Sequence, residues 1–390
     1  MLTQSFAEAV AEAERIITGA PFIETEADLA EGYDYLAGSI RASLQLAWAY
    51  QRDFPFFVAS TGPYTKLGLD NPDALYFHSY LRDDAEYVVT GKRGTTSDLS
   101  FQVLNGDYSP VEVPDSLSAF DDRAIEVAAD GSFELRFGPG EAGPNYFPLG
   151  PGSAMLIVRE VYSDWDTEQR GTITIHRADR AGSAPPPAST GAMAKRYTVA
   201  GKILLSRLRT FLAFPDWFYL NEPVNTLTGP RRTPGGLASQ FSSVGHFELG
   251  EDQAMIVTVP AAAKDVAPYQ GIQLGSRWYI SLDYINRQTS LTADQARACP
   301  DGMLRFVISE RDPCVANWLD TTGHRRGFVQ LRWQRLTRDL GPADGPQVEV
   351  VPFAELPGRL PHYEQARVTP KEWAERIAAR QAAVARRMLG

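Results

Sequence analysis

The sequence is short of cysteine and of positive charge. Two cysteines in 390 residues are too few for a disulfide framework, and they favour a reducing compartment. Acidic residues outnumber Lys and Arg by 48 to 38, which gives a net charge of −10. Because binding to nucleic acids and to anionic membranes depends on cationic surface, we expect neither as a partner.

Targeting and cofactor motifs are missing as well. Residues 1–17 carry acidic residues where a signal peptide needs positive charge, and no stretch approaches the ~20 apolar residues of a membrane span. We therefore expect a cytoplasmic protein. There is no G-x-x-x-x-G-K-[ST] phosphate loop, no G-x-G-x-x-G and no G-x-S-x-G nucleophile elbow. The five histidines never fall at H-x-H or H-E-x-x-H spacing, so we expect no metal and no cofactor.

Aromatic residues, glycine and proline are plentiful: 19 Phe, 16 Tyr, 7 Trp, 32 Gly and 27 Pro. This balance favours short strands joined by many turns over helical bundles. Short runs bounded by Gly, Pro, Asn or Asp predict strands between 74 and 176, a pattern typical of a β-sandwich or jelly roll. The clearest strands of a second region are Ala254–Val259, Trp278–Tyr284, Met303–Ile308 and Phe328–Trp333.

The two strand-rich regions share one order of landmarks. An Asp-Gly turn precedes an apolar run, an Asn-aromatic pair follows, and an arginine lies in the closing strand. The paired landmarks are Asp130-Gly131 with Asp301-Gly302, Asn145-Tyr146 with Asn317-Trp318, Arg159 with Arg332, and the segment 97–105 with 276–286. The fold class predicted is mainly β: two related jelly-roll or β-sandwich units from an internal duplication, with N-terminal, central and C-terminal helices. The Asn and Arg pairs should superimpose.

Helical signals frame the two units. Capping-box pairs occur at Ser5 with Glu8, Thr25 with Asp28, and Thr369 with Glu372. The stretch 181–192 (AGSAPPPASTGA) reads as a linker, and an apolar stripe after it predicts a helix ending near Pro215. The closing helix should dock on the domain surface or on a second copy of the chain in a homodimer. The expected segments are 1–55 (N-terminal helical), 56–180 (first unit), 181–240 (linker, helix and aromatic segment), 241–355 (second unit) and 356–390 (C-terminal tail and helix).

The first candidate site opens the first unit. Tyr76 and His78 lie two apart on a predicted strand, so their side chains share one face. A carboxylate, a phenol and an imidazole together can move a proton. Asp73, Tyr76 and His78 are therefore candidate catalytic residues, with Asn71 as a candidate binding residue. The alternative is a turn formed by the Asn and Asp side chains before the strand.

The second candidate site is the loop 320–326. His324 beside Asp320 could act as an oriented general base, and Arg325 could hold an anion or phenolate. The equivalent loop of the first unit, 150–153, has neither residue type, which is more easily explained by function than by folding. The alternative is a polar loop that satisfies backbone groups. The candidate binding residues beside these loops are Asn145, Tyr146, Asn317 and Trp318.

A third candidate lies between the units, in the aromatic run Asp216–Pro223. Trp217 and Tyr219 could line an aromatic cleft, which suits flat apolar ligands. The alternative is that this run forms interdomain core.

Two motifs resemble known bacterial families of unknown function. Asn71-x-Asp73-x-Leu75-Tyr76 is similar to the N-x-D-T-L-Y opening of family twelve fifty-four. Asn145 through Arg159, and Asn317 through Arg332, resemble the N-W-L-P…L-R signature of family twelve-fourteen. The likeness covers about 67–177 and 241–333. It implies a jelly-roll β-sandwich and no established catalytic residues.

These observations lead to three hypotheses of function. The first is a cofactor-independent enzyme of aromatic compound catabolism that acts by acid/base chemistry. It would be a lyase, with a hydrolase or isomerase less favoured, and its substrate a hydrophobic aromatic or polycyclic small molecule such as a phenolic dimer. The alternative is a non-catalytic β-sandwich protein that binds a small molecule or carbohydrate, since fold does not decide function. A structural or assembly subunit is a third hypothesis.

Overall fold

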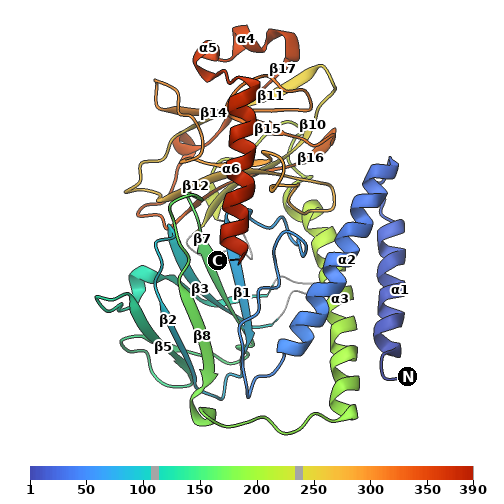
Figure 1. Ribbon diagram of the computed structural model, residues 1–390, viewed down its shortest axis with the longest axis vertical. Helices are drawn as coiled ribbons and strands as arrows, with labels where there is room; N and C mark the ends of the chain where they lie inside the picture. Colours follow the sequence, from blue (N-terminus) through green and yellow to red (C-terminus); the bar gives the residue numbers. More distant parts are fainter. Residues whose placement is uncertain (107–113, 233–239, 390) are drawn as a thin grey trace.

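The first unit is a sandwich of two four-stranded sheets (Figure 1). The computed structural model describes residues 1–106, 114–232 and 240–389. Sheet A1 has the order β1-β7-β3-β4, and sheet B1 the order β6-β5-β2-β8. The strands are β1 (Ala74–Tyr80), β2 (Tyr87–Lys92), β3 (Asp98–Leu104), β4 (Ser116–Asp121), β5 (Ser132–Gly138), β6 (Tyr146–Pro148), β7 (Met155–Val161) and β8 (Thr172–Arg177). Alternate side chains, among them Phe101, Leu135 and Val158, fill the space between the sheets.

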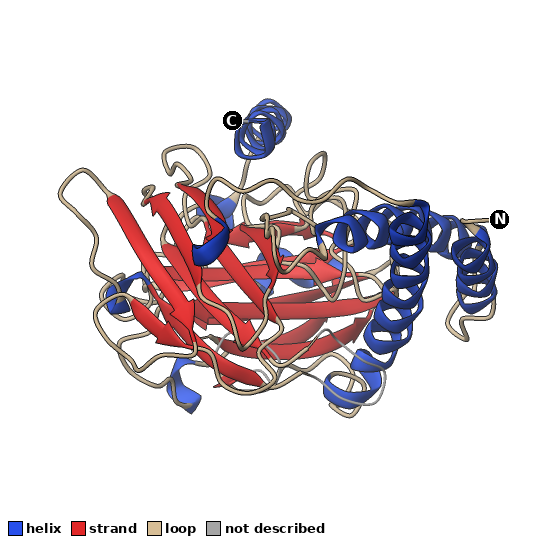
Figure 2. Ribbon diagram, turned by 90° about the horizontal axis from the view of Figure 1, so that it is seen from below, coloured by secondary structure: helices blue, strands red, loops and turns tan. Residues whose placement is uncertain are grey.

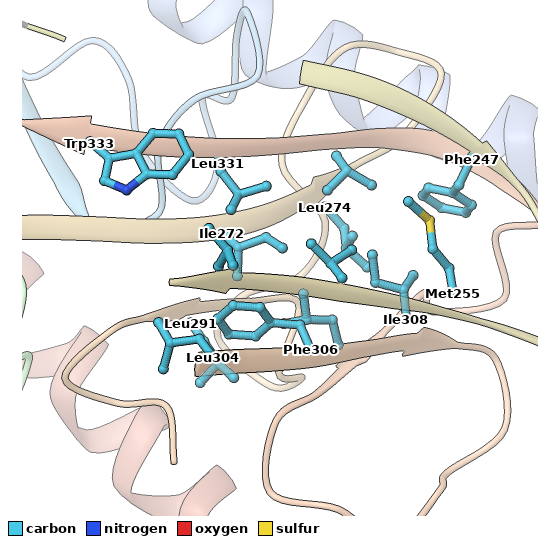
Figure 3. Close-up of a cluster of buried hydrophobic side chains, with 14 of the residues drawn as sticks. Phe247, Met255, Ile272, Leu274, Leu291, Leu304, Phe306, Ile308, Leu331 and Trp333 are labelled. Atoms are coloured by element: carbon cyan, nitrogen blue, oxygen red, sulfur yellow. The ribbon is translucent and has the colours of Figure 1, made fainter. Parts of the chain in front are cut away.

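The second unit repeats this architecture. Sheet A2 has the order β13-β12-β16-β10-β9, and sheet B2 the order β15-β14-β11-β17. The strands are β9 (Arg231–Arg232), β10 (Phe241–Glu248), β11 (Gln253–Pro260), β12 (Tyr269–Gly275), β13 (Ser290–Thr292), β14 (Met303–Ser309), β15 (Trp318–Asp320), β16 (Arg326–Gln334) and β17 (Gln347–Pro352). Figure 3 shows the core between the sheets, where Leu274, Leu331 and Trp333 of sheet A2 meet Phe306 and Ile308 of sheet B2.

Every described strand of the first unit has a counterpart in the second, where only the short edge strand β9 is additional among the described residues; this confirms the predicted duplication. In sheet order, β1-β7-β3-β4 corresponds to β10-β16-β12-β13, and β6-β5-β2-β8 to β15-β14-β11-β17. The parallel pairs β5–β6 and β14–β15 also correspond. At the Asp-Gly turns, Gly131 and Gly302 both have positive φ, 85° and 76°, a conformation that favours glycine.

The paired asparagines make the same contacts in both units. Glu126 N donates to Asn145 Oδ1 (2.7 Å) and Asn145 Nδ2 donates to Glu126 O (3.0 Å). Arg297 N and O bind Asn317 in the same way, both at 2.8 Å. Each asparagine therefore ties the loop before the Asp-Gly turn to the start of a short parallel strand.

One predicted strand is wrong. Residues 278–284 form a loop in which Tyr279 has φ 57°, and the counterpart of β3 is β12, not the segment 276–286. Trp278 is buried against the helices, where its ring lies 4.8 Å from that of Phe22 and its Nε1 donates to Asp28 O (2.9 Å). β12 was not predicted from the sequence, because one of its faces carries polar residues and glycine.

Three long helices gather at one side of the strands (Figure 2): α1 (Gln4–Thr18), α2 (Glu26–Ala49) and α3 (Thr190–Phe218). The outer face of sheet A1 packs under α2 and α3 through Tyr80, Met155 and Ile157. The end of α3 packs on sheet A2 through Phe214 and Phe328. The helices therefore cover the outer faces of both A sheets.

Two of the three predicted helix caps are confirmed, and one is wrong. Asp28 N donates to Thr25 Oγ1 (3.1 Å) and Thr25 N to Asp28 Oδ2 (2.9 Å), so this capping box is confirmed. Thr369 and Glu372 form another. The Ser5 cap is wrong, because α1 begins at Gln4. α3 continues through Pro215 to Phe218.

The C-terminal helix α6 (Pro370–Leu389) docks on its own chain, between the units (Figure 1). It follows the short helices α4 (Leu356–Arg359) and α5 (Tyr363–Ala366). Val384 is buried with Tyr162, Trp165 and Tyr284, and Arg387 Nη1 donates to Pro72 O (3.0 Å). In the parts of the chain that the structure describes, no helix has both the length and the apolar character needed to cross a membrane.

Candidate functional site

A cleft of about 1190 Å³ lies between the end of α2, the first half of α3 and the end of β1. Its walls are largely apolar and include Ala47, Tyr50, Tyr80, Val199 and Ile203. This volume is more than enough for a drug-sized ligand, since such pockets occupy roughly 300–1,000 Å³.

The rim of the cleft is positively charged in a protein whose net charge is −10. Its described lining holds Arg52, Arg82, Lys195, Arg196 and Lys202 against Asp53, Asp83 and Asp84. Arg82 binds Asp84 at 2.8 Å, whereas Lys195 and Lys202 form no ion pair with a carboxylate of the described chain. The cleft should therefore attract anions.

Three elements lead from the cleft to a buried polar cluster. On β1, Tyr80 lines the cleft, and His78 lies two residues deeper on the same face. On α3, Ile203 lines the cleft, and Arg207 follows one turn further on. On α2, the cluster residue Ser39 lies two turns before Ala47, which also lines the cleft.

His78 is buried, with 6% of its surface exposed. Its Nδ1 lies 2.9 Å from Ser60 Oγ, and the Val58 backbone also acts on the ring as a hydrogen-bond partner. Burial, followed by the positive charges of Arg207 and Arg159, lowers the pKa of His78 to about 3. The imidazole is therefore neutral at pH 7.

Two buried arginines flank His78 with few partners. Arg159 Nη1 donates to Gln102 Oε1 (2.8 Å), and its guanidinium lies 5.8 Å from the centre of the Tyr76 ring. The guanidinium of Arg207 makes no hydrogen bond or ion pair with any described residue, and its Nε is fully buried. Tyr35 Oη and Ser39 Oγ on α2 are also buried; they lie close to each other and form no close hydrogen bond with the rest of the described chain.

The structure places Asn71 and Asp73 in a separate joint between the units. Tyr269 Oη donates to Asp73 Oδ2 (2.7 Å), Trp165 Nε1 donates to Asp73 Oδ1 (2.9 Å), and Asn71 Nδ2 donates to Tyr269 Oη (3.0 Å). Burial raises the pKa of Asp73, against the opposing effects of the Tyr269 bond and of Arg387. Both carboxylate oxygens are engaged, so Asp73 joins β1 to β12 rather than facing the cleft.

The structure does not bring His324 and Arg325 to the cleft or to His78. His324 Nε2 lies 3.1 Å from Glu31 Oε2 on α2, and Arg325 pairs with Glu251 at the surface. Burial lowers the pKa of His324, but the hydrogen bond to Glu31 and its charge outweigh it, so the net direction is upward.

The remaining candidates lie within the framework or away from the cleft. Trp318 is buried against Trp373, and its Nε1 donates to Ser309 O (3.0 Å). Tyr219 is buried between α3 and sheet A2, where its hydroxyl donates to Gln330 Oε1 (3.0 Å). Trp217 is 38% exposed on α3. Asn145 and Asn317 lie directly before β6 and β15, and Tyr146 is the first residue of β6.

Sequence reasoning missed Ser60 and Arg207. Arg207 did leave a signal, because it interrupts the apolar stripe of α3 at helical spacing between Leu204 and Phe211. Ser60 left none, since its position depends on the fold of the loop before β1. Among the described residues, no group of three or more His, Cys, Asp or Glu is arranged to hold a metal.

The chain shares its fold with a solved protein along nearly its whole length. An uncharacterized protein from Burkholderia cenocepacia is 27% identical, with 91% of this chain and 98% of that chain covered and a TM-score of 0.81. A protein from Vibrio parahaemolyticus covers 88% of this chain at 14% identity, with a TM-score of only 0.43. No family model and no curated protein matches the chain.

Proposed function

We propose that this chain is a cofactor-independent acid–base enzyme that acts on an apolar aromatic small molecule in the cleft, with His78 as the proton acceptor. One observation carries the proposal: a neutral imidazole, held by Ser60, lies in a buried polar cluster two residues along β1 from Tyr80, which lines a large apolar cleft with a cationic rim. A perturbed histidine at the end of a cleft is a frequent mark of a reaction site.

The geometry fits a lyase of the retro-aldol type. His78 would take the proton of a substrate hydroxyl, and the electrons left on that oxygen would form a carbonyl and break the neighbouring carbon–carbon bond. The departing carbanion would then take the proton back from the imidazolium. Arg159 and Arg207 would stabilise the oxyanion in a site shielded from water.

A binding protein without chemistry is the second candidate, and the burial of His78 favours it. With a pKa of about 3, the imidazole of the empty site is a weak base, and only a bound anion would raise that pKa by offsetting the arginine charges. If no anion binds there, His78 serves to shape the cavity.

The test compares turnover of phenolic dimers by the wild-type protein and by His78→Asn. Asparagine keeps a polar atom near Ser60 but cannot accept a proton. We expect a rate lower by about 10²–10⁴-fold, an almost unchanged melting temperature, and activity that survives EDTA. His176→Ala, in β8 of sheet B1, is the matched control. An equal rate for His78→Asn removes the residue from the mechanism, and ligand binding without turnover supports the second candidate.

A further inference from the structure

We infer that the molecule bound in the cleft carries a carboxylate, and that Arg207, one helical turn beyond the lining residue Ile203, is its anchor together with Arg159. This inference rests on the cleft of the proposed function, but it does not depend on any reaction taking place there. It deepens that proposal by specifying the class of ligand.

The inference rests on Arg207, a buried arginine without a counter-ion among the described residues. Arg207 is 7% exposed, and in the described chain no acceptor or carboxylate reaches its guanidinium. A guanidinium has five N–H donors that need acceptors, and removing it from water is costly unless they are satisfied. Such a residue is therefore poised for an anion that the chain itself does not supply.

Two hydroxyl groups strengthen this assignment. Tyr35 Oη and Ser39 Oγ lie one helical turn apart on α2; both are buried, and the Ser39 hydroxyl is close enough to act on the Tyr35 hydroxyl. The charge of Arg207 acts on the Tyr35 hydroxyl from α3. Together these groups offer a planar fork and two single donors, the arrangement that suits the two oxygens of a carboxylate.

The carboxylates nearby are already engaged. Asp70 accepts from Ser281 Oγ (2.9 Å) and Ser281 N (3.2 Å), and it lies in the field of Lys66. Asp73 is held by Tyr269 and Trp165. Neither forms an ion pair with Arg207 or Arg159, so the positive charge beside His78 is left without compensation.

The surroundings also define the rest of the ligand. Leu46, Met155 and Ile157 pack together between α2, α3 and sheet A1, and Ile203, which packs against them, lines the cleft together with Ala47 and Val199. An apolar body attached to the carboxylate would lie against them and gain from their burial. A phosphate group, with more charge and no apolar body, fits these walls less well.

Binding of a carboxylate at Arg207 should change the pKa of His78. The charges of Arg207 and Arg159 depress the pKa of His78, so a carboxylate seated between them should raise it. The same ligand would thereby raise the pKa of His78 toward the range in which an imidazole acts as a general base.

Calorimetric titration with benzoate tests the anchor. Arg207→Gln should weaken benzoate binding by at least about tenfold, the effect of losing a charged hydrogen bond. Benzyl alcohol, a neutral molecule of the same shape, should bind weakly to both proteins. Arg209→Gln is the matched control, since Arg209 is exposed on the same helix and paired with Glu12.

Two further measurements test whether Arg207 has only a structural role. The empty Arg207→Gln and Arg207→Met proteins should melt no lower than the wild type, because they lose an unpaired buried charge. In the wild type, benzoate should move the NMR titration of His78 to higher pH, and the Arg207 variants should lose that movement.

The outcomes separate this inference from the proposed function. Equal benzoate affinity in wild type and Arg207→Gln, tighter binding of inorganic phosphate than of benzoate, or melting well below the wild type in both Arg207 variants would each overturn the anchor. If benzoate binding depends on Arg207 while His78→Asn keeps full turnover, the anchor stands and the catalytic assignment fails.

Discussion

The two β units place an arginine at the same position and use it differently. Arg159 pairs with Ser100 across β7 and β3, and Arg332 pairs with Gly271 across β16 and β12. Each donates to a glutamine two residues further along the neighbouring strand. Arg332 donates in addition to Leu69 O and Gln330 Oε1, both at 2.7 Å, whereas Arg159 has no further hydrogen-bond partner among the described residues.

The difference shows that equivalent positions in two duplicated units can take different roles. In the second unit the arginine is held by three protein acceptors and fastens the segment before β1 to sheet A2. In the first unit the same position keeps spare donors beside His78. Features that recur in both units are explained by the fold, and features of one unit only need another explanation.

Removing each arginine gives the largest expected contrast. Arg332→Met should lower the free energy of unfolding by about 3–5 kcal/mol, because three buried acceptors lose a charged donor. Arg159→Met should lower it by only about 1 kcal/mol, since one hydrogen bond is lost along with an uncompensated charge. Urea denaturation followed by circular dichroism measures both. Equal losses would show that Arg159 is as structural as Arg332.

A second contrast concerns Asp98 and Tyr269, which begin the equivalent strands β3 and β12. The Tyr269 hydroxyl donates to Asp73, whereas both oxygens of Asp98 are buried without a hydrogen bond. Burial, then the charges of Asp121 and Asp122, raises the pKa of Asp98 to about 7, against the charges of Arg335 and Arg93.

This contrast predicts a pH dependence of stability. Between pH 4 and 7 the folded protein keeps the Asp98 proton that the unfolded chain loses, so stability falls as pH rises and levels off above about pH 7. Asp98→Asn should abolish this fall and be more stable than the wild type at pH 8 by roughly 1–3 kcal/mol. Tyr269→Phe should destabilise at every pH. Parallel wild-type and Asp98→Asn profiles would mean that Asp98 ionises normally.

The smallest contrast is between the paired asparagines. Asn317 is buried, and its Nδ2 also lies 3.1 Å from Arg305 O, whereas Asn145 is half-buried with φ 50°. Asn317→Ala should cost about 2 kcal/mol. Asn145→Gly should cost about 1 kcal/mol or less, because glycine relieves the left-handed backbone while the hydrogen bonds are lost. Thermal denaturation of the two variants measures the difference, and a reversed order would contradict the burial argument.

Much of the fold could be predicted because the duplication is marked by short sequence motifs that recur in both units. The Asp-Gly turns, the Asn-aromatic pairs and the closing arginines each depend on neighbours close in sequence. β12 could not be recognised, since its sequence, YQGIQLG, serves an outer face that is polar and buried. That burial comes from the first unit, where Asp73 meets Tyr269 and Asp70 meets Gln273, and no local pattern reveals it.

The candidate site was predicted only in part. His78 and Tyr76 were found because alternation places them on one face, and they do share the outer face of sheet A1. Ser60, Arg159 and Arg207 come from a loop, a distant strand and a helix, so only the tertiary structure brings them to His78. His324 looked as distinctive as His78 in sequence, and only its pairing with Glu31 separates the two.

The docking of α6 has a consequence for the order in which the protein matures during synthesis. Arg387, three residues from the end of the chain, contacts Pro72 at the beginning of β1, and Arg380 and Arg387 stack on Trp165, which binds Asp73. Because Arg387 follows Pro72 by 315 residues, the first unit must wait through the synthesis of the whole second unit before this contact can form. The joint around Asp73 is therefore completed later than the core of either unit.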